Sequence, residues 1–142
     1  MPTLMTRQQQ LSYEVLGEGS PILLLHSFLC SSEMWRPQIE YLAQTYQVIS
    51  LDLRGHGKSS PSLPHSLYDL VEDAVAVLDH ESVDEAIWCG LSIGGMISMR
   101  AALLYPERVR GLILLDTDAR RETRWTRFEN RLLGYVARAV GV

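Results

Sequence analysis

Residues 90–94 read Gly-Leu-Ser-Ile-Gly, a G-x-S-x-G pattern that places Ser92 between two glycines. The pattern falls where an apolar run typical of a buried strand gives way to a helical run, so the chain must turn sharply at Ser92. Glycines let backbones approach closely around such a strained turn. The first amides of the helix and the positive end of its dipole point at the same place. The sequence therefore predicts a projecting hydroxyl beside a helix terminus that stabilises an oxyanion.

A serine hydroxyl is a weak nucleophile until a base takes its proton, so the four histidines are the first candidates for a base. His26 ends a buried strand, where a hydrogen-bonding role is expected, and His56 is expected to be a turn residue. His65 is expected in a solvated loop, and His80 at a helix end, where an imidazolium suits the dipole. None of the four is predicted to be the general base, and none follows Ser92.

Other chemistry-bearing residues are few. Asp116 ends the last apolar strand, at the edge where sites of α/β proteins gather, and is either a site acid or a turn or cap residue. Asp52 and Arg54 are expected to fix their loop by local hydrogen bonds. Cys30 and Cys89 are isolated, and neither H-E-x-x-H nor C-x-x-C occurs, so no metal site is predicted.

The elements that must position these residues alternate along the chain. Helical spacing predicts helices over 31–44, 67–78 (capped by Ser66) and 93–107 (stopped by Pro106), and apolar runs predict strands over 21–28, 46–53, 84–90 and 109–116. A further strand over 10–17 precedes a turn marked by glycines and a proline, which favours a β-hairpin at the start. Alternating strands and helices predict the α/β class, with a mostly parallel sheet covered on both faces.

The composition and charge of the chain exclude several classes of function. The chain has 142 residues, of which 46% are hydrophobic and 21% charged, as expected for one globular domain. A net charge of −4 supplies no basic field for nucleic acid or anionic lipid. The N-terminus does not resemble a signal peptide, and no apolar run approaches the roughly 20 residues of a membrane helix. Two cysteines are too few for a disulfide scaffold, so a cytoplasmic protein that does not bind membranes is predicted.

Four segments, in order, resemble the alpha/beta-hydrolase family. HSF at 26–28 resembles its H-G-x oxyanion loop, and LDLRGHGKSS at 51–60 its D-x-R-G-x-G-x-S loop. WCGLSIGGM at 88–96 resembles its nucleophile elbow, and YPERVRGLILLD at 105–116 is similar to its passage from helix to strand. The resemblance extends to about residue 118 and is closest in wording to the enol-lactonase and small-esterase branch. It implies the doubly wound hydrolase sheet, lacking its last strands.

The resemblance also implies roles for individual residues. Ser92 corresponds to the nucleophile, and the backbone N–H groups of Phe28 and Ile93 to the oxyanion hole. Ser27 stands where the family usually has glycine, and a Cβ there can alter the path of the backbone that aims Phe28. Some relatives place the acid of the triad at the position of Asp116. In the family the acid and the histidine follow later strands, so both are expected from outside these 142 residues. No organic cofactor is implied, and a nucleotide-binding G-x-G-x-x-G is absent.

Two domain parts are predicted: residues 1–118 form the N-terminal part of the hydrolase core, and residues 119–142 an amphipathic helix that begins a cap or an association segment. The predicted strand 109–116 is nearly all apolar, as a central strand should be, yet it is the last of its row. An exposed apolar edge invites pairing, so we expect the C-terminal helix to cover it, or a homo-oligomer to form through the strand or the helix.

The sequence is compatible with two functions. The first is a serine hydrolase of small carboxylic esters or lactones, with the triad acid and histidine supplied from outside this chain. The second is a catalytically incomplete hydrolase-like domain that acts, if at all, by binding or association.

Overall fold

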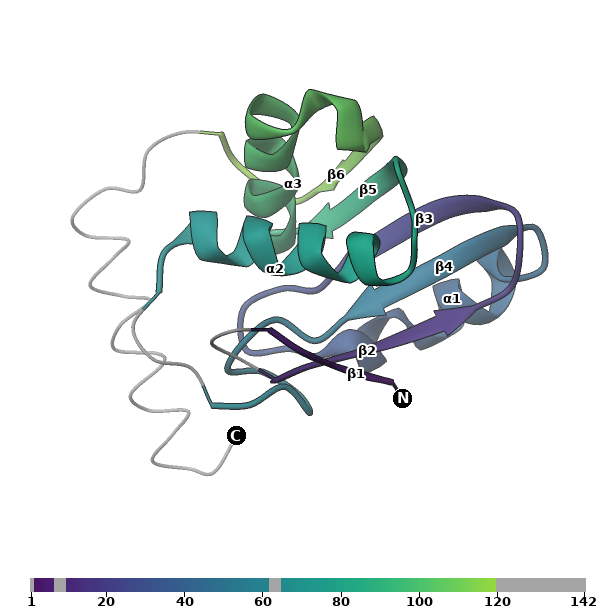
Figure 1. Cartoon of the computed structure of the whole chain (residues 1–142), viewed down its shortest axis with the longest axis horizontal. Helices are drawn as coiled ribbons and strands as arrows, with labels where there is room; N and C mark the ends of the chain where they lie inside the picture. Colours follow the sequence, from purple (N-terminus) through teal and green to yellow (C-terminus); the bar gives the residue numbers. More distant parts are fainter. Residues whose placement is uncertain (1, 7–9, 62–64, 120–142) are drawn as a thin grey trace.

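The computed structural model describes residues 2–6, 10–61 and 65–119. These residues form a six-stranded sheet in the order β1-β2-β4-β3-β5-β6 (Figure 1). The strands are β1 Thr3–Met5, β2 Gln10–Leu16, β3 Ser20–Leu25, β4 Tyr46–Leu51, β5 Ala86–Leu91 and β6 Val109–Leu115. Strand β3 is parallel to β4 and β5, and β5 is parallel to β6, whereas β2 is antiparallel to β1 and β4. The predicted α/β class with a mostly parallel sheet is confirmed.

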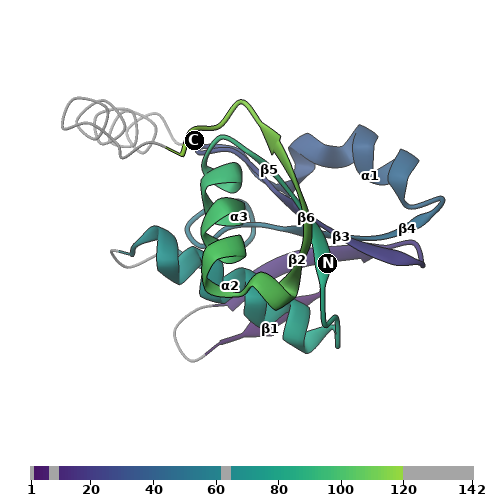
Figure 2. The same ribbon diagram turned by 90° about the horizontal axis from the view of Figure 1, so that it is seen from above.

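Helices cover both faces of the sheet. Helix α1 (Arg36–Leu42, after the 3-10 helix η1, Ser32–Trp35) lies on one face, and α2 (Leu67–His80) and α3 (Ile93–Leu104) lie on the other (Figure 2). Ser66 caps α2 as predicted: its hydroxyl accepts the Asp69 N–H, and its own N–H donates to the Asp69 carboxylate at 2.7 Å. Helix α3 ends before Pro106, which begins the short 3-10 helix η2 (Pro106–Arg108).

The core has two layers because β3 is buried on both faces. Leu23 and Leu25 belong to the layer under α2 and α3, and Ile22 and Leu24 to the layer under α1. Their burial explains why this strand reads as a continuous apolar run rather than an alternating one. The central strands are thereby fixed in place, and the residues that follow them are held at the carboxyl edge of the sheet.

The β-hairpin expected at the start is wrong for strands β2 and β3, because β4 lies between them. Gly17 and Gly19 have positive φ angles of 78° and 117°, but they do not form a tight hairpin turn. A Cβ on Gly17 would lie 2.3 Å from the Tyr46 carbonyl oxygen and 2.4 Å from that of Ala43. The glycines therefore let the chain pass close over the connection from α1 to β4.

Strand β6 is the outermost strand on its side of the described sheet, as the apolar-edge argument anticipates. Its last four residues are 38–44% exposed: Leu112, Ile113, Leu114 and Leu115. The helix predicted over 119–142 lies outside the described residues from residue 120 onwards, so the proposed division at residue 118 stays a prediction.

Candidate active site

Ser92 lies at the junction of β5 and α3, in a sharp turn that we call the serine turn (residues 90–94). Its φ of 52° and ψ of −111° are unusual for a residue with a side chain. The residue is partly exposed, and its N–H donates to the Leu115 carbonyl at the end of β6, at 3.0 Å. The side chain is thus neither inside the packed interior nor in the middle of a helix.

The two glycines of the serine turn are required by contacts between backbones. A Cβ on Gly90 would lie 2.2 Å from the carbonyl carbon of Gly94, and a Cβ on Gly94 would lie 2.2 Å from the carbonyl oxygen of Leu25. The first turn of α3 therefore lies directly on the ends of β5 and β3. This close packing is the reason for the G-x-S-x-G spacing in this chain.

Residues 27–30, which we call the oxyanion loop, follow β3. The Cys30 N–H donates to the Ser27 carbonyl at 3.1 Å, and Leu29 between them has a φ of 59°. A positive φ at the third of four turn residues is typical of a type II turn. The turn hydrogen bond does not use the N–H of Phe28, the residue to which the family resemblance assigns the second oxyanion contact.

His26 holds the oxyanion loop through both ring nitrogens. The Leu53 N–H donates to His26 Nε2 at 3.0 Å, so Nε2 carries no proton. The proton of the neutral ring is therefore on Nδ1, which donates to the Ser27 carbonyl at 2.7 Å. Burial lowers the pKa of His26 to about 4, so the ring is neutral at pH 7. The hydrogen-bonding role expected for His26 is confirmed.

The oxyanion loop and the serine turn follow adjacent parallel strands. Leu25 of β3 is opposite Gly90 of β5, so Phe28 and Ile93 each follow their paired residue by three positions. The Ile93 N–H is the first of α3 and has no carbonyl partner within the helix. The structure thus brings Ser92 and the segments of both expected oxyanion donors to the same edge of the sheet.

Asp52 organises the loop over 52–60. Its Oδ1 accepts the Ser32 N–H at 2.7 Å, and its Oδ2 accepts the Lys58 N–H at 2.9 Å. A Cβ on Gly57 would lie 2.3 Å from Asp52 Oδ2, so the loop closes tightly around the carboxylate. The expected loop-fixing role of Asp52 is confirmed.

The local role expected for Arg54 is wrong. Its Nε and Nη2 donate to the two carboxylate oxygens of Asp73 in α2, each at 2.6 Å, and both side chains are buried. Arg54 therefore ties the loop to a helix residue 19 positions away. Local sequence patterns do not reveal a partner at that separation.

The remaining histidines do not bind the serine. The His56 ring packs edge-on against Phe28 with centroids 5.7 Å apart, a contact that the sequence did not reveal. His65 is exposed before α2, and His80 ends α2. Within the described residues, no hydrogen bond joins a histidine to Ser92.

Asp116 lies one residue beyond the Leu115 carbonyl that binds the Ser92 N–H. It is exposed and has a φ of 41°. In the described part of the chain, its carboxylate makes no hydrogen bond or ion pair with a histidine. Its role as the catalytic acid stays a prediction.

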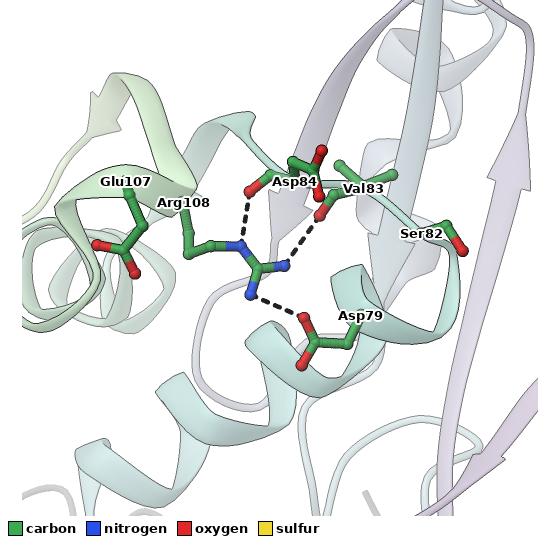
Figure 3. A pocket seen from close by; sticks show the side chains of 6 residues that line it. All are labelled: Asp79, Ser82, Val83, Asp84, Glu107 and Arg108. Carbon is green, nitrogen blue, oxygen red and sulfur yellow. Dashed lines mark hydrogen bonds and ion pairs between the residues drawn. The ribbon is translucent and has the colours of Figure 1, made fainter.

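A hollow of about 430 Å³ lies at the opposite end of the sheet, lined by Asp79, Ser82, Val83, Asp84, Glu107 and Arg108 (Figure 3). The Arg108 guanidinium donates to the carbonyls of Asp84 and Val83 at 2.6 and 2.9 Å and pairs with the Asp79 carboxylate at 2.7 Å. All three nitrogens already have protein partners, so Arg108 joins the end of α2 to the starts of β5 and β6. We assign this region a structural role.

Within residues 2–6, 10–61 and 65–119, no three His, Cys, Asp or Glu side chains are grouped in a way that could hold a metal ion. No helix in them is both long enough and apolar enough to cross a membrane.

Comparison with known proteins identifies the family. A sequence model of the alpha/beta hydrolase fold matches residues 20–140, so the chain belongs to the alpha/beta hydrolase family. A protein of Azorhizobium caulinodans named as a carbamate hydrolase, RutD, is 41% identical over 121 residues, which are 84% of this chain and 46% of that protein. The 3-oxoadipate enol-lactonase 2 of Acinetobacter baylyi is 36% identical over 121 residues, 83% of this chain and 45% of its own.

Solved structures agree with this assignment. The structure titled Est816, an N-acyl homoserine lactone degrading enzyme, superposes with a TM-score of 0.82 at 36% identity, covering 94% of this chain and 54% of that one. The chain thus spans about half the length of the relatives that it matches.

Proposed function

We propose that Ser92 is the nucleophile of a serine hydrolase that cleaves small carboxylic esters or lactones. The observation that carries this proposal is the backbone of Ser92, whose positive φ places the residue in a sharp, partly exposed turn at the start of α3. Strained backbone at such a site is typical of functional residues. The relatives named as a lactonase and a lactone-degrading enzyme support the substrate class.

In the proposed reaction, Ser92 Oγ attacks the carbonyl carbon of the substrate while a base removes the hydroxyl proton. The carbonyl oxygen gains the negative charge and accepts hydrogen bonds from the N–H groups of Phe28 and Ile93. Collapse of the intermediate expels the alkoxide, which takes up a proton, and leaves an acyl-serine. Water then attacks the acyl-serine to release the acid and restore Ser92.

The base in this scheme comes from outside the described residues. His26 is unsuited to the task, because Nε2 accepts the Leu53 N–H and Nδ1 donates to the Ser27 carbonyl. Asp116 is the candidate acid that would orient an incoming histidine, since it lies at the same edge as Ser92. The substrate preference of the whole protein therefore depends on the residues that supply the base and complete the site.

Covalent labelling tests the proposal. In the whole protein, including the residues that supply the base, a fluorophosphonate probe should phosphonylate Ser92 with loss of fluoride, and peptide mass spectrometry locates the modified residue. Ser82 is a matched control, because it is exposed and has a φ of 57°, but it does not begin a helix. We expect labelling to disappear in Ser92→Ala and to be unchanged in Ser82→Ala. Equal labelling of wild type and Ser92→Ala contradicts the proposal.

A second candidate function is association by a catalytically incomplete domain. It is favoured by β6, whose last four residues are 38–44% exposed on the outermost strand of the described sheet. A homo-oligomer through this strand, or through the residues from 119 onwards, stays a prediction, as does a cytoplasmic location.

Sedimentation equilibrium tests the association through β6. A charge on an edge strand opposes pairing, so Ile113→Lys should shift an oligomer to monomer. Leu103→Lys is the control, because Leu103 is 82% exposed on α3 and not on the edge strand. A wild-type monomer at every concentration, or equal effects of the two substitutions, contradicts this function.

A further inference from the structure

The backbone of Ser92 is held on both sides by the last residue of β6 and the segment that follows it. Its N–H donates to the Leu115 carbonyl at 3.0 Å, and its carbonyl accepts the Thr117 hydroxyl at 2.7 Å. The Ser92 carbonyl also accepts the Met96 N–H at 3.1 Å, a hydrogen bond of the first turn of α3. The unusual turn at Ser92 is therefore over-determined by contacts from two different elements.

Thr117 is itself fixed by packing. A Cβ on Gly95 would lie 2.6 Å from Thr117 Cγ2 and 2.7 Å from Thr117 Oγ1, so the threonine fills the space that a larger residue at position 95 would occupy. Threonine is branched at Cβ and has few side-chain rotamers. Its methyl group and hydroxyl thus meet the backbone of the α3 N-terminus in one defined orientation.

The geometry points to a consequence for the oxyanion site. The Ser92 carbonyl and the Ile93 N–H belong to the same planar, trans peptide, so they point in opposite directions. A hydrogen bond that fixes the carbonyl therefore fixes the direction of the N–H. We propose that Thr117 is a positioning residue, which aims the Ile93 N–H at the reacting oxygen by holding the Ser92 carbonyl.

The oxyanion loop has the same arrangement. His26 Nδ1 donates to the Ser27 carbonyl at 2.7 Å, and that carbonyl shares its peptide with the Phe28 N–H. Each expected oxyanion donor thus belongs to a peptide whose carbonyl is held by a side chain from outside that peptide. The Thr117 and His26 contacts, after the adjacent strands β5 and β3, thus act in the same way: each holds a carbonyl and thereby sets the direction of an N–H group.

This inference rests on the proposed function, so its test needs one measurement of chemistry and one that is independent of it. Thr117→Val removes the hydroxyl and keeps the shape, whereas Thr117→Ser keeps the hydroxyl and removes the methyl group. For fluorophosphonate, we expect Thr117→Val to slow the labelling step at saturating probe by about tenfold to a hundredfold, with little change in probe affinity. We expect Thr117→Ser to stay within a few-fold of wild type.

The second measurement is amide hydrogen exchange followed by NMR. In Thr117→Val, the amides of Ser92 and Met96 should exchange faster than in wild type, while amides of β3 keep their rates. Thr117→Ser should match wild type. If Ser92 is not labelled in any variant, the proposed function fails, and amide exchange alone decides the positioning role. Unchanged exchange in Thr117→Val, a general rise across the sheet, or equal behaviour of the two variants overturns the inference.

Discussion

The buried His26 ring should make the stability of this fold depend steeply on pH. In the folded chain, burial lowers the pKa of His26 from 6.5 to about 4. Between these two values the unfolded chain binds a proton that the folded chain does not. Stability therefore rises with pH across this window, and it is lost as the pH falls from about 6.5 to about 4.

The size of the effect follows from the shift. One pKa unit corresponds to 1.36 kcal/mol, so the shift of His26 corresponds to a loss of about 3 kcal/mol between pH 7 and pH 4. That is a large part of the roughly 5–15 kcal/mol that stabilises a typical domain. The hydrogen bonds with Ser66 lower the pKa of Asp69 from its ordinary value of 3.8. Stability therefore changes through Asp69 only below about pH 4, which lies outside most of the range from pH 6.5 to pH 4.

Urea unfolding from pH 7 to pH 4 measures this dependence. His26→Gln has no titrating ring, so it should be less stable than wild type at pH 7 but lose about 3 kcal/mol less on acidification. The NMR signals of the wild-type ring give a second measurement that needs no variant, and they should show no titration above pH 5. Equal slopes for the two proteins, or a ring that titrates near pH 6.5 in the folded state, refute the reasoning.

Three further predictions concern stability. Gly94→Ala should prevent normal folding, because its Cβ would lie 2.2 Å from the Leu25 carbonyl oxygen. Gly111→Ala should be nearly neutral, since nothing lies within 4 Å of a Cβ there. Thermal unfolding followed by circular dichroism compares the two variants. Arg54→Ala should cost about 3–5 kcal/mol in urea unfolding by leaving the Asp73 carboxylate buried and unpaired, and the double variant Arg54→Met, Asp73→Leu should recover much of the loss. Burial raises the pKa of Tyr13, so wild-type stability should fall above pH 10 as the unfolded phenol ionises, and Tyr13→Phe should flatten this fall in alkaline unfolding curves.

Much of the fold is predictable because its signals are local. The apolar run that became β3 and the Ser66 cap of α2 can be identified within a few residues of sequence. The serine turn is predictable for the same reason, since its glycines and the change from strand to helix lie within one short segment.

The errors and omissions concern contacts between distant segments. The pairing of Arg54 with Asp73 joins a loop to a helix, and the Thr117 hydroxyl reaches a carbonyl 25 positions earlier in the chain. The hairpin prediction failed because Gly17 accommodates the backbone around Tyr46, a packing partner that the local turn signal does not contain. Such partners are fixed by the order of strands in the sheet, which short patterns leave open.

The two glycines of the serine turn are needed for packing and not for the reaction itself. A side chain at Gly90 or Gly94 would clash with backbone atoms, and this clash does not depend on the hydroxyl of the residue between them. A relative with another small residue in place of Ser92 would lack the proposed nucleophile and would still need both glycines for the same packing. The paired glycines therefore mark the fold, whereas activity also needs the residue between them and the base that completes the site.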